Sequence, residues 1–519
     1  MHKVYHYPER NNEDMRASGV LLPITSLPSP YGIGCFSKEA YEFVDNLVAA
    51  GQTYWQILPL GPTGYGDSPY QSCSTFAGNP YFIDLVTLKE QGLLTEEECT
   101  LCEPQKDARY VDYEQIYKVR FQVLHMAFER ANPKDNHEFR QFCEQHAVWL
   151  DDYALYMVVK NQFEGKSWCQ WEDDIRMRQA EAMNAYLEQY QEEFLFYQYI
   201  QYEFSQQWYD LKTYANKKGI RIIGDLPIYV ALDSADSWAH PELFQFDEQR
   251  RPLAVAGCPP DGFTATGQLW GNPLYQWEYH KETNYRWWIE RITYCRIFYD
   301  VIRIDHFRGF DEYYSIPYGH ETAEYGQWEK GPGYDLFEQM KKVLGEIPII
   351  AEDLGFLTDS VMQLVTDSGY PGMKVLQFAF DSRDSDTYLP HTYEHNCVVY
   401  TGTHDNNTTK GWYRGFHQYG REFLRDYLGK EKEDENTIVW DMIRMAQASV
   451  AHTCIIPMQD YLELGEEARM NEPSTIGLNW KWRLLQGEFP QELVERMREM
   501  TTLYHRRPKI QSIHDNSLN

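Results

Sequence analysis

The chain has 519 residues, 43% of them hydrophobic, with a formal net charge of −30 and an isoelectric point near 4.9. A polyanion is poorly suited to bind nucleic acid or an anionic membrane, because neutralising phosphates requires clustered Lys and Arg. The N-terminus lacks an apolar signal region and no run approaches a membrane span, so we expect a cytoplasmic protein without nucleic-acid or membrane partners. Solubility is the simplest explanation of the charge, and a neutral substrate is compatible with it.

The predicted elements begin with a βαβ unit. Residues 19–23 form a predicted strand, a helix with an apolar stripe runs between its cap Ser37 and its stop Gly51, and residues 54–58 form the second strand. A strand, a helix and a strand in such short succession indicate a parallel sheet.

Six further strand candidates bring the count to eight, the number that a closed (β/α)8 TIM barrel requires. They are residues 220–223, 299–304, 348–351, 373–380, 397–400 and 453–457. We therefore predict an α/β fold in which residues 1–519 form a single catalytic barrel domain, without a separate C-terminal β-domain.

Two gaps between these strands are too long for one crossover and must hold insertions. Residues of about 80–215 are rich in Glu, Gln, Tyr and Leu and nearly free of proline, which predicts a mainly helical insertion. Residues of about 240–290 are punctuated by glycine and proline, which predicts a movable lid loop at the mouth of the barrel.

Acidic residues follow three of the predicted strands. Asp305 ends one apolar run, Glu352 and Asp353 follow a second, and Asp405 follows a third. The carboxyl ends of barrel strands face one shared mouth, where catalytic groups gather. Three convergent carboxylates predict nucleophilic and acid–base chemistry on a glycosidic bond. The aromatic share of 15% is compatible with this, because aromatic rings pack against the faces of sugars.

The spacing of Arg303 and Asp305 places both side chains on one face of a strand. A guanidinium beside Asp305 is expected to lower its pKa and hold it ionised, as a nucleophile needs. An ordinary buried salt bridge would explain the same pattern.

Glu352 follows an apolar sleeve that is expected to raise its pKa, so that it can donate a proton near neutral pH. Asp353 is its rival, since successive strand residues alternate in direction and only one of the two can enter the mouth. Spacing alone does not choose between them. His404 and Asp405 could bind sugar hydroxyls at the third strand end, and a capping Asp beside a satisfied His is the alternative.

No metal and no cofactor are expected. The one closely spaced cysteine pair, Cys99 and Cys102, lacks a second pair nearby and lies among glutamates, so we interpret it as a surface feature.

Five motifs resemble those of the amylomaltases, also called 4-alpha-glucanotransferases or disproportionating enzymes, and they occur in that family's order. They are GPTGYGDSPY at 61–70, GDLPIYV at 224–230, RIDHFRG at 303–309, AEDLG at 351–355 and TGTHDN at 401–406. The resemblance covers about residues 19–486.

The resemblance implies a retaining double displacement on alpha-1,4-glucans and maltooligosaccharides, with the 4-hydroxyl of another glucan or of glucose as acceptor. Asp305 would be the nucleophile, Glu352 the general acid and base, and Asp405 the residue that stabilises the oxocarbenium-like state. The residues that the resemblance assigns to glucan binding are Tyr65, Asp225, Gln268, Trp270, Arg303, Phe378 and His404.

One position departs from the family's pattern. Members often carry Tyr after the aspartate of the lid, where this chain has Gly262. A missing ring there puts that lid contact in question and would change the hydrolytic fraction or the product size. Two other hypotheses remain: an alpha-glucan hydrolase with the same carboxylates, and a catalytically inactive glucan-binding barrel.

Overall fold

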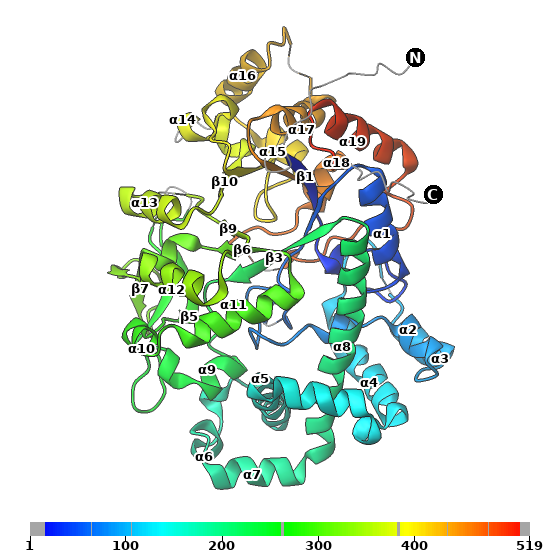
Figure 1. Cartoon of the computed structure of the whole chain (residues 1–519), viewed down its shortest axis with the longest axis vertical. Coiled ribbons are helices and arrows are strands. Elements are labelled where there is room, and N and C mark those ends of the chain that lie inside the picture. The colour runs from blue at the N-terminus through cyan, green and yellow to red at the C-terminus, as the bar shows by residue number, and fades with distance from the viewer. Residues whose placement is uncertain are drawn as a thin grey trace, which may run out of the picture.

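A computed structural model describes residues 16–508 except 64, 105, 261–263, 356, 381–384, 433 and 476, and it leaves the side chains of Tyr65, Ser385 and Asp386 undescribed. Its centre is a parallel sheet of eight strands in the order β10-β11-β12-β1-β2-β3-β6-β9 (Figure 1). The strands are β1 (Ala17–Leu21), β2 (Tyr54–Gln56), β3 (Arg221–Pro227), β6 (Val301–Asp305), β9 (Ile349–Ala351), β10 (Gly372–Val375), β11 (Cys397–Tyr400) and β12 (Thr453–Pro457). All eight predicted barrel strands are present, so the predicted TIM barrel is confirmed.

The barrel closes through few bonds between its edge strands β9 and β10. The N–H of Ala351 donates to the carbonyl of Pro371 at 3.0 Å, and the carboxylate of Asp353 accepts from the N–H of Met373 at 2.7 Å. A side-chain oxygen therefore replaces a ladder acceptor at this seam.

One predicted strand is too long. The prediction was residues 373–380, but β10 ends at Val375 and the 3-10 helix η9 (Leu376–Phe380) follows. The chain curls at the mouth of the barrel, where the Gln377 side chain donates to the carbonyl of Asn407 at 2.9 Å. This contact with the loop after β11 stabilises the curled backbone, although the apolar residues of the segment favour a longer strand.

Helices surround the sheet and cover its apolar residues (Figure 1). In α1 (Lys38–Ala49) the predicted stripe of Ala40, Phe43, Val44 and Leu47 is buried, whereas Val48, its fifth predicted member, is 39% exposed. The other helices that follow the barrel strands are α11 (Arg286–Phe298), α12 (Tyr334–Leu344), α13 (Asp359–Ser368), α14 (Ser385–Tyr388), α15 (Thr409–Gly415), α16 (Gln418–Tyr427), α17 (Ile438–Ala448), α18 (Met458–Tyr461) and α19 (Gln491–Leu503).

Between β2 and β3 the described chain is mainly helical and forms a lobe beside the barrel, at the bottom and right of Figure 1. Its helices are α2 (Leu85–Glu90), α3 (Glu96–Thr100), α4 (Tyr113–Ala131), α5 (His137–Gln162), α6 (Asp173–Arg176), α7 (Ala180–Gln189) and α8 (Gln191–Lys217). Among the described residues, none of the helices is long and apolar enough to cross a membrane.

The segment from about 240 to 290, expected to be a lid loop, contains strands. An antiparallel sheet has the order β5-β4-β7-β8, and β4 (Ala254–Cys258) and β5 (Gln268–Pro273) belong to this segment. The partners β7 (Glu312–Pro317) and β8 (Gln327–Lys330) come from beyond β6. The helix α9 (Ala235–Ala239) precedes the segment, and α10 (Trp277–Glu282) lies within it after β5. Because β4 consists mostly of small residues, its sequence shows no alternation of hydrophobic and polar side chains, and the sheet was not predicted. That the segment acts as a lid stays a prediction, and Gly262 lies outside the described residues.

Arg506 connects the C-terminal segment to the end of the barrel opposite the mouth, where the strands begin. Its guanidinium is fully buried, and its five N–H groups meet five backbone carbonyls at 2.9–3.2 Å. The acceptors are the carbonyls of Ala17, Gln447, Ser449, Ala451 and His452. Arg506 thus satisfies carbonyls at the amino ends of β1 and β12, opposite the mouth.

We expect Arg506→Ala to lower the free energy of unfolding by about 3 kcal/mol or more, because it removes five hydrogen bonds to backbone carbonyls at a buried site. Thermal unfolding followed by circular dichroism checks this, with the exposed Arg498→Ala as the matched control. Equal unfolding temperatures for the two variants would contradict the role assigned to Arg506.

Candidate active site

A cleft of about 1050 Å³ lies at the carboxyl ends of the barrel strands. Six of the residues singled out from the sequence line it: Asp305, Glu352, His404, Asp405, Gln268 and Trp270. The strands explain this convergence. Asp305 is the last residue of β6, Glu352 directly follows β9, and the loop after β11 carries Asp405. The parallel arrangement therefore brings together the three carboxylates that are far apart in sequence.

Arg303 connects two carboxylates below the cleft. Its Nη1 lies 2.8 and 2.6 Å from the two carboxylate oxygens of Asp225, and its Nη2 lies 3.1 Å from Oδ1 of Asp305. The Arg303 and Asp225 side chains are 4% and 0% exposed, whereas the Asp305 side chain is 27% exposed. Asp225 and Arg303 are thus buried supports, and Asp305 is the member of this network that opens to the cleft.

The pKa of Asp305 differs in direction from the sequence-based expectation. Arg303 was expected to lower it, but burial outweighs the guanidinium and raises the pKa of Asp305 above its ordinary value, with a further contribution from Asp405. The expectation of a lowered pKa is therefore wrong. Arg303 limits the rise and keeps a cation beside the carboxylate.

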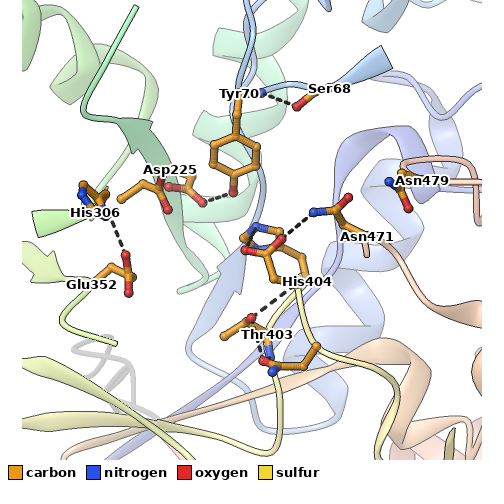
Figure 2. Close-up of polar contacts among 12 residues, drawn as sticks. Ser68, Tyr70, Asp225, His306, Glu352, Thr403, His404, Asn471 and Asn479 are labelled. Carbon is orange, nitrogen blue, oxygen red and sulfur yellow. Dashed lines mark hydrogen bonds and ion pairs between the residues drawn. The ribbon is translucent and has the colours of Figure 1, made fainter. Parts of the chain in front are cut away.

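Glu352 is held by two backbone N–H groups. His306 donates to its Oε2 and Leu354 to its Oε1, both at 2.8 Å, and the first contact is drawn in Figure 2. Burial nevertheless raises the pKa of Glu352 to about 7; Arg303 opposes the rise and the charge of Asp305 adds to it. The direction agrees with the sequence prediction, and this carboxyl can exchange a proton near neutral pH.

His306 supplies its N–H from a left-handed backbone conformation, with φ 53°. Such a conformation is unfavourable for a residue with a side chain and occurs where the surroundings enforce it. Burial, helped by Arg308, lowers the pKa of His306 to about 3, so its ring is neutral. The ring meets the edge of Trp270 at a centroid distance of 4.8 Å and an interplanar angle of 90°.

Asp353 does not enter the cleft. Its carboxylate is turned to the backbone of β10, where it accepts from Met373, and the residue is 9% exposed. The structure therefore resolves the choice that spacing left open, because Glu352 alone of this pair lines the cleft.

Asp405 lies across the cleft with two partners. Nδ2 of Asn471 donates to its Oδ1 at 2.6 Å, and Nε2 of His404 lies 3.4 Å from its Oδ2. Burial lowers the pKa of His404, which favours a neutral ring that hydrogen-bonds rather than an ion pair. The ring of Tyr70 stacks on His404 at 5.2 Å, and its hydroxyl donates to Asp225 at 2.7 Å (Figure 2).

The remaining predicted binding residues are placed differently. Gln268 and Trp270 lie on β5 and line the cleft, and the indole N–H of Trp270 donates to Oε1 of Gln268 at 3.1 Å. Phe378 lies in η9 against the edge of Tyr388 and is not among the residues that line the cleft. Tyr65 belongs to η3 (Tyr65–Asp67), and its side chain lies outside the described part.

Sequence patterns missed Tyr70, Asn471 and Trp480, all of which line the cleft. Tyr70 is the last residue of the family motif at 61–70, but the motif gave no indication that Tyr70 lines the cleft. Asn471 and Trp480 lie in an irregular segment after α18, and no periodicity or motif pointed to them.

The part of the chain that the structure describes contains no cluster of three or more His, Cys, Asp or Glu residues that could hold a metal ion. Cys99 and Cys102 are buried in the core, 0% and 3% exposed, so their interpretation as a surface feature is wrong. The helix α3 packs Cys99 inward and the turn after it buries Cys102, which the exposed glutamates of α3 concealed.

An eight-stranded barrel with carboxylates, an aromatic wall and a carboxyl group of near-neutral pKa at its mouth defines a TIM-barrel enzyme of glycoside chemistry. Comparison with known proteins specifies the family. A family model described as 4-alpha-glucanotransferase matches residues 22–487. This chain belongs to the 4-alpha-glucanotransferase family.

Curated relatives of that name match over nearly their whole length. The protein from Clostridium butyricum is 48% identical over 488 residues, covering 93% of this chain and 100% of the relative. The protein from Streptococcus pneumoniae is 49% identical over 494 residues, covering 95% of this chain and 97% of the relative.

Solved structures agree with the fold. The amylomaltase of Streptococcus agalactiae, in complex with acarbose, is 40% identical and has a TM-score of 0.92, covering 95% of this chain and 100% of that chain. The amylomaltase of Corynebacterium glutamicum, 20% identical with a TM-score of 0.71 over 95% of this chain and 74% of that chain, shares the fold.

Proposed function

We propose that this protein transfers alpha-1,4-glucan segments from a donor to the 4-hydroxyl of an acceptor glucan or glucose, by a retaining double displacement. Membership of the 4-alpha-glucanotransferase family favours transfer over the hydrolase hypothesis. The amylomaltase of Streptococcus agalactiae was solved in complex with acarbose, which supports an oligosaccharide as the ligand of this chain.

The observation that carries the mechanism is the pairing of Asp305 with Glu352. Asp305 is the nucleophile: its carboxylate opens to the cleft beside Arg303, whose positive charge opposes the rise of its pKa and favours the ionised form. Glu352, with a pKa raised to about 7, protonates the departing glycosidic oxygen. The products of this step are a glycosyl ester on Asp305 and a free 4-hydroxyl on the leaving glucan.

The second step reverses these roles. Glu352, now ionised, takes the proton from the acceptor's 4-hydroxyl, which attacks the anomeric carbon and releases Asp305. Asp405, fixed by Asn471 and His404, is placed to stabilise the positive charge that develops on the sugar. The retaining route requires the carboxyl groups of Asp305 and Glu352 to lie about 5–5.5 Å apart, which remains a prediction.

Gln268 and Trp270 bind the glucan from β5, while Asp225 and Arg303 act on it through Asp305 and Tyr70. The segment that carries Gln268 and Trp270 is also the proposed lid, which would exclude water so that a sugar hydroxyl accepts the glycosyl group.

Counting reducing ends separates transfer from the other two hypotheses. Purified protein incubated with maltotriose is expected to produce glucose and longer maltooligosaccharides while the number of reducing ends stays constant, because each transfer breaks and forms one bond. A rise that matches glycosidic bond loss would establish a hydrolase. Unchanged maltotriose would establish the inactive binding barrel.

A further inference from the structure

The seam between β9 and β10 contains an acidic side chain that the proposed mechanism does not use. Asp353 lies directly after Glu352, and its Oδ1 accepts from the N–H of Met373 at 2.7 Å in a buried contact. The neighbouring connection across the seam is the backbone bond from Ala351 to Pro371, at 3.0 Å. The carboxylate of Asp353 therefore continues the pairing of the two strands beyond the end of β9.

The backbone of β10 is shaped to admit this carboxylate. A Cβ atom at Gly372 would lie 2.3 Å from Oδ2 and 2.8 Å from Cγ of Asp353, far inside contact distance. The backbone conformation of Gly372 does not itself require glycine, since its φ is not positive. Close approach of the Asp353 side chain is thus the reason for glycine at this position.

Glu352 is held on its other side by β6. Its N–H donates to the carbonyl of Ile304 and its own carbonyl accepts from Phe307, both at 3.1 Å. The end of β9 is therefore held differently on its two sides. Backbone hydrogen bonds join it to β6 and to the residues that follow β6, whereas the Asp353 carboxylate joins it to β10. Movement of Glu352 away from β6 would compress the contact of its neighbour Asp353 with Met373, and movement toward β6 would stretch it.

We propose that Asp353 is a positioning residue for the reaction, which locks the end of β9 against β10 and so aims the Glu352 carboxyl at the glycosidic oxygen. This inference rests on the acid–base role proposed for Glu352. Asp353 is not among the residues that line the cleft, so it acts through the backbone of its neighbour Glu352. The alternation of a strand assigns the two consecutive acidic residues to different tasks, one in the mouth and one in the seam.

A shift of β10 could also affect the site through the side chain of Met373, and the experiment must distinguish this effect from the one through Asp353. The thioether of Met373 lies 3.4 Å from Nε of Arg303, so a shift of β10 could also reach Asp305 through the guanidinium. Met373→Leu preserves the N–H that Asp353 accepts and removes only the sulfur contact. It is the matched control for the side-chain route, and kcat/KM within about threefold of the parent is expected because the volumes are similar.

Asp353→Ala is expected to lower kcat/KM for maltotriose about 10–100-fold, as a displacement of the order of 1 Å does for a reacting group. The kcat/KM for fluoride release from alpha-maltotriosyl fluoride should fall less than about threefold, because fluoride leaves without a proton from Glu352. Asp353→Asn, which retains an oxygen acceptor, should recover most of the lost activity. Gly372→Ala should mimic the loss, and the double variant should be no worse than either single one.

The outcomes distinguish this inference from the proposed function. If Glu352→Gln is inactive on maltotriose but Asp353→Ala is not impaired, positioning by Asp353 is wrong and the mechanism stands. Equal losses on maltotriose and on the fluoride, or a Met373→Leu variant as poor as Asp353→Ala, would also overturn it. If Glu352→Gln is fully active, the acid–base assignment itself fails. Circular dichroism of each variant confirms that the fold is retained.

Discussion

Asp305→Asn is expected to reduce glucan transfer by a factor on the order of 10⁴ or more, because an amide oxygen cannot form the glycosyl ester on which the double displacement depends. The fold should survive the change. Arg303 keeps its contacts of 2.6 and 2.8 Å to Asp225 after losing the one to Asp305 at 3.1 Å. The buried guanidinium is therefore not left unpaired.

The assay is product formation from maltotriose resolved by chain length, with unfolding temperature measured in parallel. Asp335→Asn is the matched control: it makes the same chemical change at an exposed ion pair with Lys281, outside the cleft. Near-parental activity in Asp305→Asn would refute the nucleophile assignment. Mass spectrometry of the parent protein treated with a slow fluorinated donor adds a direct check, since the covalent sugar should be found on the peptide that contains Asp305.

The barrel could be predicted from sequence because buried parallel strands leave a strong signal. Short apolar runs such as Ile349–Ala351 and Cys397–Tyr400 are hydrophobic on both faces, which distinguishes them from the surrounding amphipathic helices. The carboxylates stood out for the same reason, since each ends or follows an apolar run. The barrel strands and the carboxylates at their ends could therefore be predicted from the sequence.

The antiparallel sheet beside the mouth lacked this contrast. Residues of β4 are small and those of β8 are mostly exposed, so neither strand shows a hydrophobic alternation. Its pairing joins segments on both sides of β6, and such long-range contacts are not encoded by any local pattern.

The electrostatics of the site could be predicted only in part. The apolar sleeve around Glu352 was visible in sequence, and its raised pKa followed from it. The pKa of Asp305 depended on how deeply the carboxylate is buried and on the approach of Asp405, which lies 100 residues further along the sequence in the loop after β11. The sequence shows that Arg303 is a neighbour of Asp305, but it does not show the burial of Asp305, which raises the pKa that Arg303 lowers. The partner of Asp405, Asn471, lies in an irregular segment and gave no signal at all.

Glu352→Gln should separate acid–base catalysis from nucleophilic attack. We expect kcat/KM on maltotriose to fall about 10²–10⁴-fold, since the amide cannot donate a proton to the leaving oxygen. Fluoride release from alpha-maltotriosyl fluoride should be affected far less, because Asp305 still attacks and fluoride needs no protonation. Glu338→Gln, an exposed change in α12 that removes a pairing with Lys342, is the matched control.

The pH dependence of kcat/KM provides the most specific test of Glu352 as the proton donor. Glu352 must be protonated in the first step, and its pKa is raised to about 7, so kcat/KM of the parent on maltotriose should fall as the pH rises through about 7. Asp305 must be ionised, and its pKa is raised, so activity should also fall on the acid side, at a pH above the ordinary value for Asp. Only the alkaline limb belongs to Glu352. It should therefore disappear in Glu352→Gln while the acid limb remains, and an alkaline limb near pH 7 that persists in this variant would assign the proton donor to another residue.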